Sequence, residues 1–119
     1  MIKIENMNHA VEFVKLNDLC LVFVKGRTGN MSETVLDNSE EALIKEYPEI
    51  PSIIVTLEKT PDFSRKYTIF STPTILLFFR GREVLRQSMF FNFGQLKNDI
   101  DLWSKTFISL ENDPFYGLY

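Results

Sequence analysis

The run LCLVFV at residues 19–24 is apolar at every position, and this run limits the fold more than any other feature of the chain. In a strand, successive side chains point to opposite faces, so both faces of this strand have to be covered. Such a strand lies in the centre of a sheet that carries other elements on both sides. A chain of 119 residues is long enough for one domain of this kind and too short for two.

Segments with strand and helix patterns alternate along the chain. Strands are predicted at 2–5, 19–24, 52–58, 73–79 and 83–90, and Arg80-Gly81-Arg82 joins the last two as an antiparallel hairpin. Capping patterns predict helix starts at Asn6, Asn30, Thr60-Pro61 and Asn92. The helix that begins at Asn30 is expected to kink or restart near residue 38. The last helix carries an apolar stripe formed by Phe93, Leu96, Ile100, Trp103 and Phe107. The order βαβαβαββα predicts a mixed sheet in a three-layer α/β/α domain.

Charge and hydropathy exclude several classes of partner. The net charge of -3 comes from interspersed signs, so no basic stripe indicates nucleic-acid binding. The longest apolar run, ILLFF at 75–79, is far shorter than the roughly 20 residues that span a bilayer. Polar residues interrupt the N-terminal segment, which therefore does not resemble a signal peptide. We expect a cytoplasmic protein with no membrane partner and no cofactor.

The single cysteine, Cys20, limits redox and metal chemistry. It cannot form an intrachain disulfide, and the chain has no Cys/His cluster that would bind a metal. Because Cys20 lies inside the apolar run, we expect a buried structural thiol, with a reactive thiol as the alternative. The single histidine, His9, has no second ligand nearby in the sequence, and we interpret it as a surface or capping residue.

The second half of the chain resembles a thioredoxin. The stretch TPDFSRKYTIFSTPTILLFFRGREV at 60–84 has a proline-started helix, Tyr-x-Ile, and Pro-Thr before an apolar strand with Gly81 eight residues after Pro73. The resemblance covers about residues 2–107. It implies the thioredoxin fold for a domain at 1–108, followed by an aromatic tail at 109–119.

The resemblance also implies where a site would lie. It places Thr28-Gly29-Asn30-Met31 where thioredoxins carry Cys-Gly-Pro-Cys. It implies a cis Thr72–Pro73 bond beside that loop, with the backbone of Thr72 pairing with a client peptide; a trans proline at the start of an edge strand is the alternative. Val22 takes the place of the family's buried acid, and Met89 takes the place of a groove glycine.

Without a thiol pair, thiol exchange in the family's manner is excluded, because it needs an attacking and a resolving sulfur. We therefore expect a binding protein rather than an enzyme. Its polypeptide partner would bind non-covalently in a groove formed by Arg27, Thr28, Gly29, Asn30, Met31, Thr72, Pro73 and Met89. One alternative is a vestigial, inert groove. A second alternative is a protein of cell redox homeostasis that uses Cys20 or a partner's thiols. A third is a weak anion site at residues 29–31, assisted by Arg27.

Aromatic residues are concentrated in MFFNF at 89–93 and in the tail DPFYGLY at 113–119. We expect Phe90, Phe91 and Phe93 to pack under the last helix. The alternatives are a homodimer patch, or a tail that docks in the groove of a neighbouring molecule.

Overall fold

The computed structural model describes residues 2–4, 6–26 and 40–111, and residues 1, 5, 27–39 and 112–119 lie outside the described part. Its strands are β1 (Ile2–Ile4), β2 (Leu19–Lys25), β3 (Ser52–Thr56), β4 (Thr74–Phe79) and β5 (Arg82–Ser88). Its helices are α1 (Met7–Leu16), α3 (Asp62–Lys66) and α4 (Phe93–Glu111), and residues 40–46 are also helical. The α4 helix continues three residues into the segment that was expected to be a tail at 109–119.

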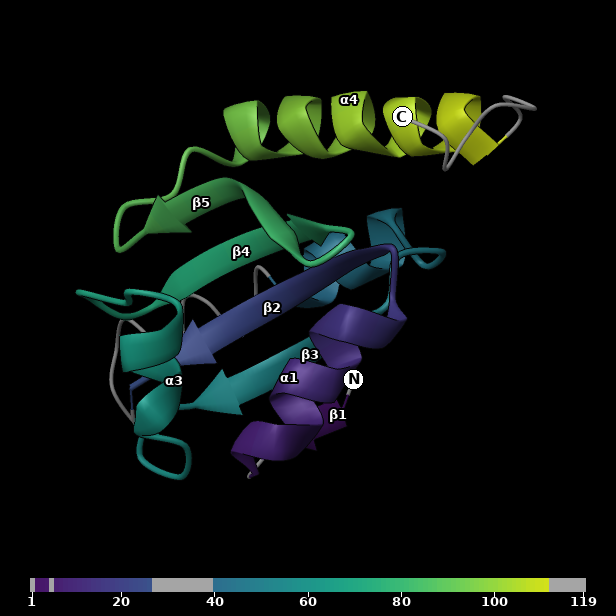
Figure 1. Cartoon of the computed structure of the whole chain (residues 1–119). Helices are drawn as coiled ribbons and strands as arrows, with labels where there is room; N and C mark the ends of the chain where they lie inside the picture. Colours follow the sequence, from purple (N-terminus) through teal and green to yellow (C-terminus); the bar gives the residue numbers. More distant parts are fainter. Residues whose placement is uncertain (1, 5, 27–39, 112–119) are drawn as a thin grey trace.

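The five strands form one mixed sheet in the order β1-β3-β2-β4-β5. The strand β3 is parallel to both β1 and β2, whereas β4 is antiparallel to β2 and β5 is antiparallel to β4. The apolar strand β2 therefore has a neighbour on each side, as Figure 1 shows. The predicted mixed sheet and α/β/α fold class are confirmed.

Two apolar clusters cover the two faces of the sheet. Leu21 and Phe23 of β2 belong to the cluster under α4 and the helical residues 40–46. Val22 and Val24 belong to the cluster under α1 and α3. The alternation of side chains along β2 thus divides one apolar run between two cores, which is why every position in the run has to be apolar.

Asparagine caps begin two of the helices, as predicted. The side chain of Asn6 accepts a hydrogen bond from the backbone N of Asn8 at 2.8 Å, and Asn92 Oδ1 accepts one from Gln95 N at 3.0 Å. The predicted cap at Thr60 is wrong. Its hydroxyl donates to the carbonyl of Thr56 at 2.9 Å, in the turn that follows β3, so it does not reach the start of α3.

The predicted hairpin joins β4 and β5. Arg80 and Gly81 have φ angles of 53° and 82°, the left-handed backbone that a two-residue type I′ turn requires at both positions. The apolar stripe of α4 packs on the sheet, with Leu96 and Ile100 fully buried. No helix in the described part of the chain is long and apolar enough to cross a membrane.

Candidate functional site at the end of β2

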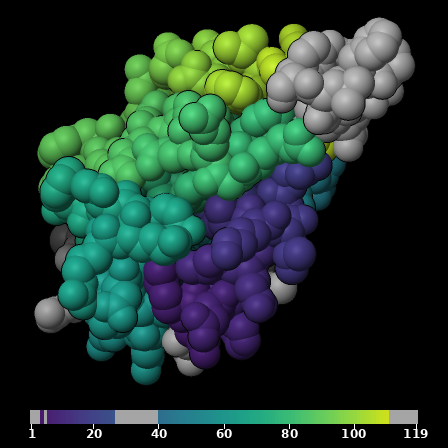
Figure 2. All heavy atoms as spheres, in the orientation of Figure 1, coloured from purple at the N-terminus to yellow at the C-terminus, as the bar shows by residue number. Residues whose placement is uncertain are grey.

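Three segments that are far apart in the sequence meet at one end of the sheet. Val24 of β2 pairs with Thr74 of β4, and Thr74 pairs with Ser88 of β5. The residues just before β4 and just after β5 therefore lie beside the end of β2, at the left of Figure 1. The space-filling view shows the green atoms that follow β5 directly beside the teal atoms around α3 (Figure 2).

Three of the predicted groove residues come together here. The peptide bond between Thr72 and Pro73 is cis. Pro73 is buried and Thr72 is half-buried, and Met89 N donates a hydrogen bond to the carbonyl of Pro73 at 2.8 Å. The other predicted groove residues, Arg27 to Met31, lie outside the described residues.

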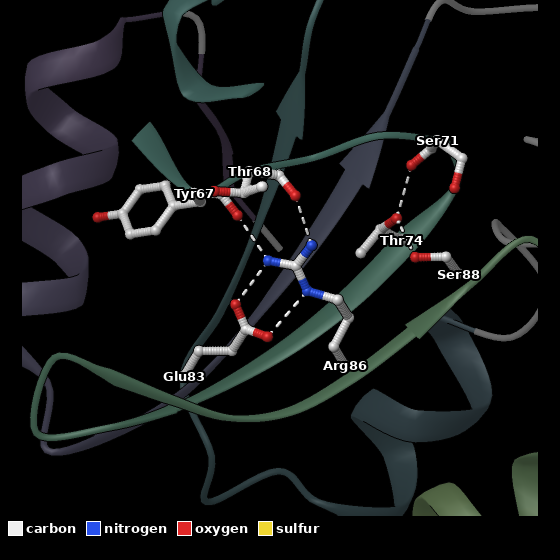
Figure 3. Close-up of polar contacts among 7 residues, drawn as sticks. All are labelled: Tyr67, Thr68, Ser71, Thr74, Glu83, Arg86 and Ser88. Carbon is white, nitrogen blue, oxygen red and sulfur yellow. Dashed lines mark hydrogen bonds and ion pairs between the residues drawn. The ribbon is translucent and has the colours of Figure 1, made fainter. Parts of the chain in front are cut away.

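Arg86 of β5 holds the loop that leads to Pro73. Its Nη1 donates to the carbonyl of Thr68 at 2.6 Å, and its Nη2 donates to the carbonyl of Tyr67 at 2.5 Å (Figure 3). Glu83 accepts two further hydrogen bonds from the guanidinium, at 2.6 and 2.8 Å. Thr68 has a φ of 56°, a conformation that side chains with a Cβ rarely adopt. The planar guanidinium thus ties an unusual turn to the neighbouring strand.

A second tie joins the same loop to the sheet closer to Pro73. The hydroxyl of Thr74 donates to the carbonyl of Ser71 at 2.7 Å and lies 2.8 Å from the hydroxyl of Ser88 (Figure 3). Since the Thr74 hydroxyl has a single proton, the Ser88 hydroxyl acts as donor in the second bond. The loop at 67–72 is therefore anchored by side chains at two places.

Met89 lies directly after β5 rather than in it. Its φ is 61°, and Phe90 N donates to the carbonyl of Ser88 at 2.7 Å, so Met89 forms the centre of a tight turn. A left-handed backbone favours glycine, the residue that the resemblance places here, and costs about 1–2 kcal/mol for other residues. The Met89 side chain remains 49% exposed beside Pro73.

Phe70 and Phe90 are 89% and 92% exposed, and they lie on the two segments that meet at Pro73. We call these two side chains and Met89, which is 49% exposed, the apolar rim. The expectation that Phe90 packs under the last helix is wrong, because the turn at Met89 directs it outward. Phe91 and Phe93 pack against the core under α4, as expected. The sequence pattern does not mark Phe70, which follows the buried Ile69 in the loop before Pro73.

A buried ion pair lies at the end of β2. Lys25 Nζ is 3.3 Å from Glu40 Oε2, and the two side chains are 9% and 5% exposed. Ion pairs this deep are costly to desolvate and strongly destabilising to break. The family's acidic position, Val22, is fully buried in the apolar cluster under α1 and α3. The buried charges at this end of the sheet are therefore Lys25 and Glu40, whereas the resemblance implies a buried acid at the position of Val22.

Cys20 lies on the face of β2 that packs under α1 and α3. It is fully buried, and burial raises the pKa of its thiol to about 12, so the thiol stays protonated at neutral pH. The predicted burial of this thiol is confirmed. His9 is exposed on α1, in line with a surface residue. Within the described residues, no three His, Cys, Asp or Glu side chains are grouped as a metal site would require.

Solved thioredoxins share this architecture. No protein-family model and no curated protein matches the sequence. Thioredoxin from Plasmodium falciparum aligns with a TM-score of 0.76 and 18% identity, over 87% of this chain and 99% of that one. Thioredoxin from Trypanosoma brucei brucei gives 0.76 and 13%, over 88% and 91%, and thioredoxin from Fasciola hepatica gives 0.68 and 23%, over 85% and 97%. The chain therefore has the thioredoxin fold, and likeness at these identities concerns the fold alone.

Proposed function

We propose that this chain is a redox-inactive thioredoxin-like protein that binds an extended polypeptide segment non-covalently at the end of β2. The groove comprises Arg27, Thr28, Gly29, Asn30, Met31, Thr72, Pro73 and Met89. The observation that carries the proposal is the apolar rim of Phe70, Met89 and Phe90. Large apolar side chains exposed together are a common mark of a binding surface.

The arrangement around Pro73 supports binding through the backbone. Thr72 lies on a loop that Arg86 and Thr74 already hold in place, so little order would be lost when a partner binds. An extended partner segment would pair with the backbone of Thr72 and place its alternate side chains against the rim. Affinity would then come from hydrogen bonds and apolar contact, with no covalent step.

The cysteine content supports the absence of redox chemistry. Thiol exchange needs a reactive thiolate and a second thiol, whereas this chain has one cysteine, with its pKa raised to about 12 by burial. The alternative is a protein of cell redox homeostasis that uses Cys20 or thiols of a partner. It requires the Cys20 thiol to react in the folded protein.

Peptide selection tests the binding. A library of random peptides displayed on phage is selected against the folded protein, and the affinities of selected peptides are measured by calorimetry. Phe90→Glu and Phe70→Glu should each weaken binding at least about tenfold, because a charge replaces apolar contact. Leu102→Glu is the matched control, since Leu102 is 61% exposed on α4 and lies outside the rim. Equal affinities for all three variants, or no selected peptide, would contradict the proposal.

An insulin-disulfide reduction assay with dithiothreitol tests the redox part. We expect the natural protein to be inactive and the Thr28→Cys/Met31→Cys variant to be active, because the fold would then regain its two thiols. Activity of the natural protein that Cys20→Ser abolishes would establish the alternative instead. Rapid labelling of Cys20 in the folded protein would point the same way.

A further inference from the structure

A cavity of about 490 Å³ lies at the start of β2, at the end of the sheet opposite the apolar rim. The described residues that form its apolar walls are Leu16, Leu19, Ile50, Pro51, Phe107 and Ile108. Figure 1 shows the start of β2 and the C-terminal end of α4 on the same side of the view. Pockets that bind small molecules have volumes of about 300–1,000 Å³ and mostly apolar walls, so this cavity has the size and lining of such a pocket.

The polar side chains in the walls can all accept hydrogen bonds. Asp18 and Glu49 carry carboxylates, and an ionised carboxylate only accepts. The Nδ2 of Asn17 donates to the carbonyl of Phe13 at 2.9 Å, which leaves Oδ1 as the acceptor for a ligand. Ser104 adds a hydroxyl, and the described lining residues include no lysine or arginine. A ligand that satisfies these groups has to supply donors.

Two helices end at the cavity with the negative poles of their dipoles. Leu16 is the last residue of α1, and Ile108 lies in the last turn of α4. The final carbonyls of a helix lack partners within the helix and carry partial negative charge. Lys15 offsets this charge at the end of α1, whereas the last turn of α4 has no basic residue. The helix ends therefore favour a cation.

The two carboxylates differ in how far they are already paired. Arg80 Nε lies 3.7 Å from Asp18 Oδ1, and both side chains are 47% exposed, so water screens this pair. Within the described residues, Glu49 forms no ion pair. Glu49 therefore supplies most of the charge that a ligand meets in the cavity, and Asp18 adds a smaller share.

We propose that this cavity binds a small molecule with an apolar body and one protonated amine. The walls take up the body, and Leu16 and Ile108, which are 81% and 55% exposed, lose contact with water. An ammonium has three donors and no acceptor, which matches the polar groups of the walls. Its charge is opposite to that of Asp18 and Glu49, whereas an anion of the same shape meets repulsion.

Three probes with the same eight-carbon chain test the proposal: octylammonium, octanol and octanoate. Each is titrated into the full, isotope-labelled chain at neutral pH and low salt, below the concentration at which it aggregates, and the affinity is taken from amide chemical shifts. The amides of Leu19 and Ile50 report binding in the cavity. The amide of Thr72 reports binding near the apolar rim, so this test is independent of peptide binding there.

We expect octylammonium to bind at least about tenfold more tightly than octanoate, a difference of about 1.4 kcal/mol, with octanol between them. Asp18→Asn/Glu49→Gln should reduce this preference to less than about threefold and leave the affinity for octanol unchanged. The matched control is Asp62→Asn/Glu58→Gln. It removes the same two charges from exposed positions outside the cavity, and Asp62 is also paired with an arginine.

Four results would overturn the proposal: no binding, equal affinities for the three probes, shifts at Thr72 instead of Leu19, or a preference that both double variants retain equally. A bulky substitution gives a separate test of the place. Ser104→Trp puts a large ring in the cavity wall and should weaken all three probes at least about tenfold. Leu102→Trp, on the same helix but outside the cavity, should leave them unchanged, and equal effects would exclude the cavity as the site.

Discussion

Replacing Arg86 by alanine should cost about 2–3 kcal/mol of the free energy of unfolding. The guanidinium donates to the carbonyls of Tyr67 and Thr68, and hydrogen bonds to charged groups contribute about 1.5–3 kcal/mol each. The side chain is 26% exposed, so solvent screening lowers the sum for the two bonds from about 3–6 kcal/mol to about 2–3 kcal/mol. For a domain of this size the loss corresponds to a fall in Tm of roughly 10 °C. Urea unfolding and thermal scans measure it.

Arg65 is a matched control that the chain itself provides. It pairs with the acid three residues before it, Asp62, as Arg86 pairs with Glu83, but its side chain is 84% exposed. Arg65→Ala should therefore cost less than about 0.5 kcal/mol. Arg86→Lys should be intermediate, because an ammonium cannot span two carbonyls as a fork does. Equal losses for the two alanine variants would refute the reasoning, as would unchanged amide exchange at 68–72 in Arg86→Ala.

Three further substitutions have expected outcomes. Lys25→Met should lower the free energy of unfolding in urea by about 3–5 kcal/mol, because it leaves Glu40 buried with its ion pair broken. Lys25→Met/Glu40→Leu should recover most of this loss, and no recovery would refute the reasoning. Alanine usually gives a more stable protein than glycine, but Met89→Gly should be more stable than Met89→Ala by about 1 kcal/mol, because residue 89 has a left-handed backbone. A more stable alanine variant would contradict that conformation. Above pH 9 the unfolded chain releases the Cys20 proton that the folded chain retains, so the free energy of unfolding falls as pH rises. Cys20→Ala should remove up to about 1 kcal/mol of this fall between pH 9 and 10. A pH profile that Cys20→Ala leaves unchanged would contradict the burial of the thiol.

Local patterns predicted most of the fold. The apolar run at 19–24 predicted a central strand, and Asn6 and Asn92 predicted helix starts through hydrogen bonds that span only two or three residues. Gly81 predicted the turn between β4 and β5 because few other residues adopt its backbone. The caps and the turn join residues that are close in sequence, so the pattern contains all of their partners, and the central strand is marked by its own unbroken apolar run.

The candidate site was harder to predict because its contacts are long in sequence. Arg86 bonds to carbonyls 18 and 19 residues earlier, and backbone acceptors leave no mark on the sequence. In the sequence, Lys25 and Glu40 resemble ordinary surface charges. They are buried only because the helical residues at 40–46 pack against the end of β2. Phe90 was placed in the wrong layer because a left-handed turn at a methionine is not visible in its residue type.

The position of β2 also bears on the order in which the chain folds. Its partners begin at Ser52 in β3 and at Thr74 in β4, so each pairing closes a loop of about thirty residues or more. The hairpin of β4 and β5, by contrast, closes through the two residues Arg80 and Gly81. Because loop closure slows the formation of non-local pairings, we expect this hairpin to form early and the central strand to be inserted late. The central strand β2 would then be among the last to pair with its neighbours in the sheet.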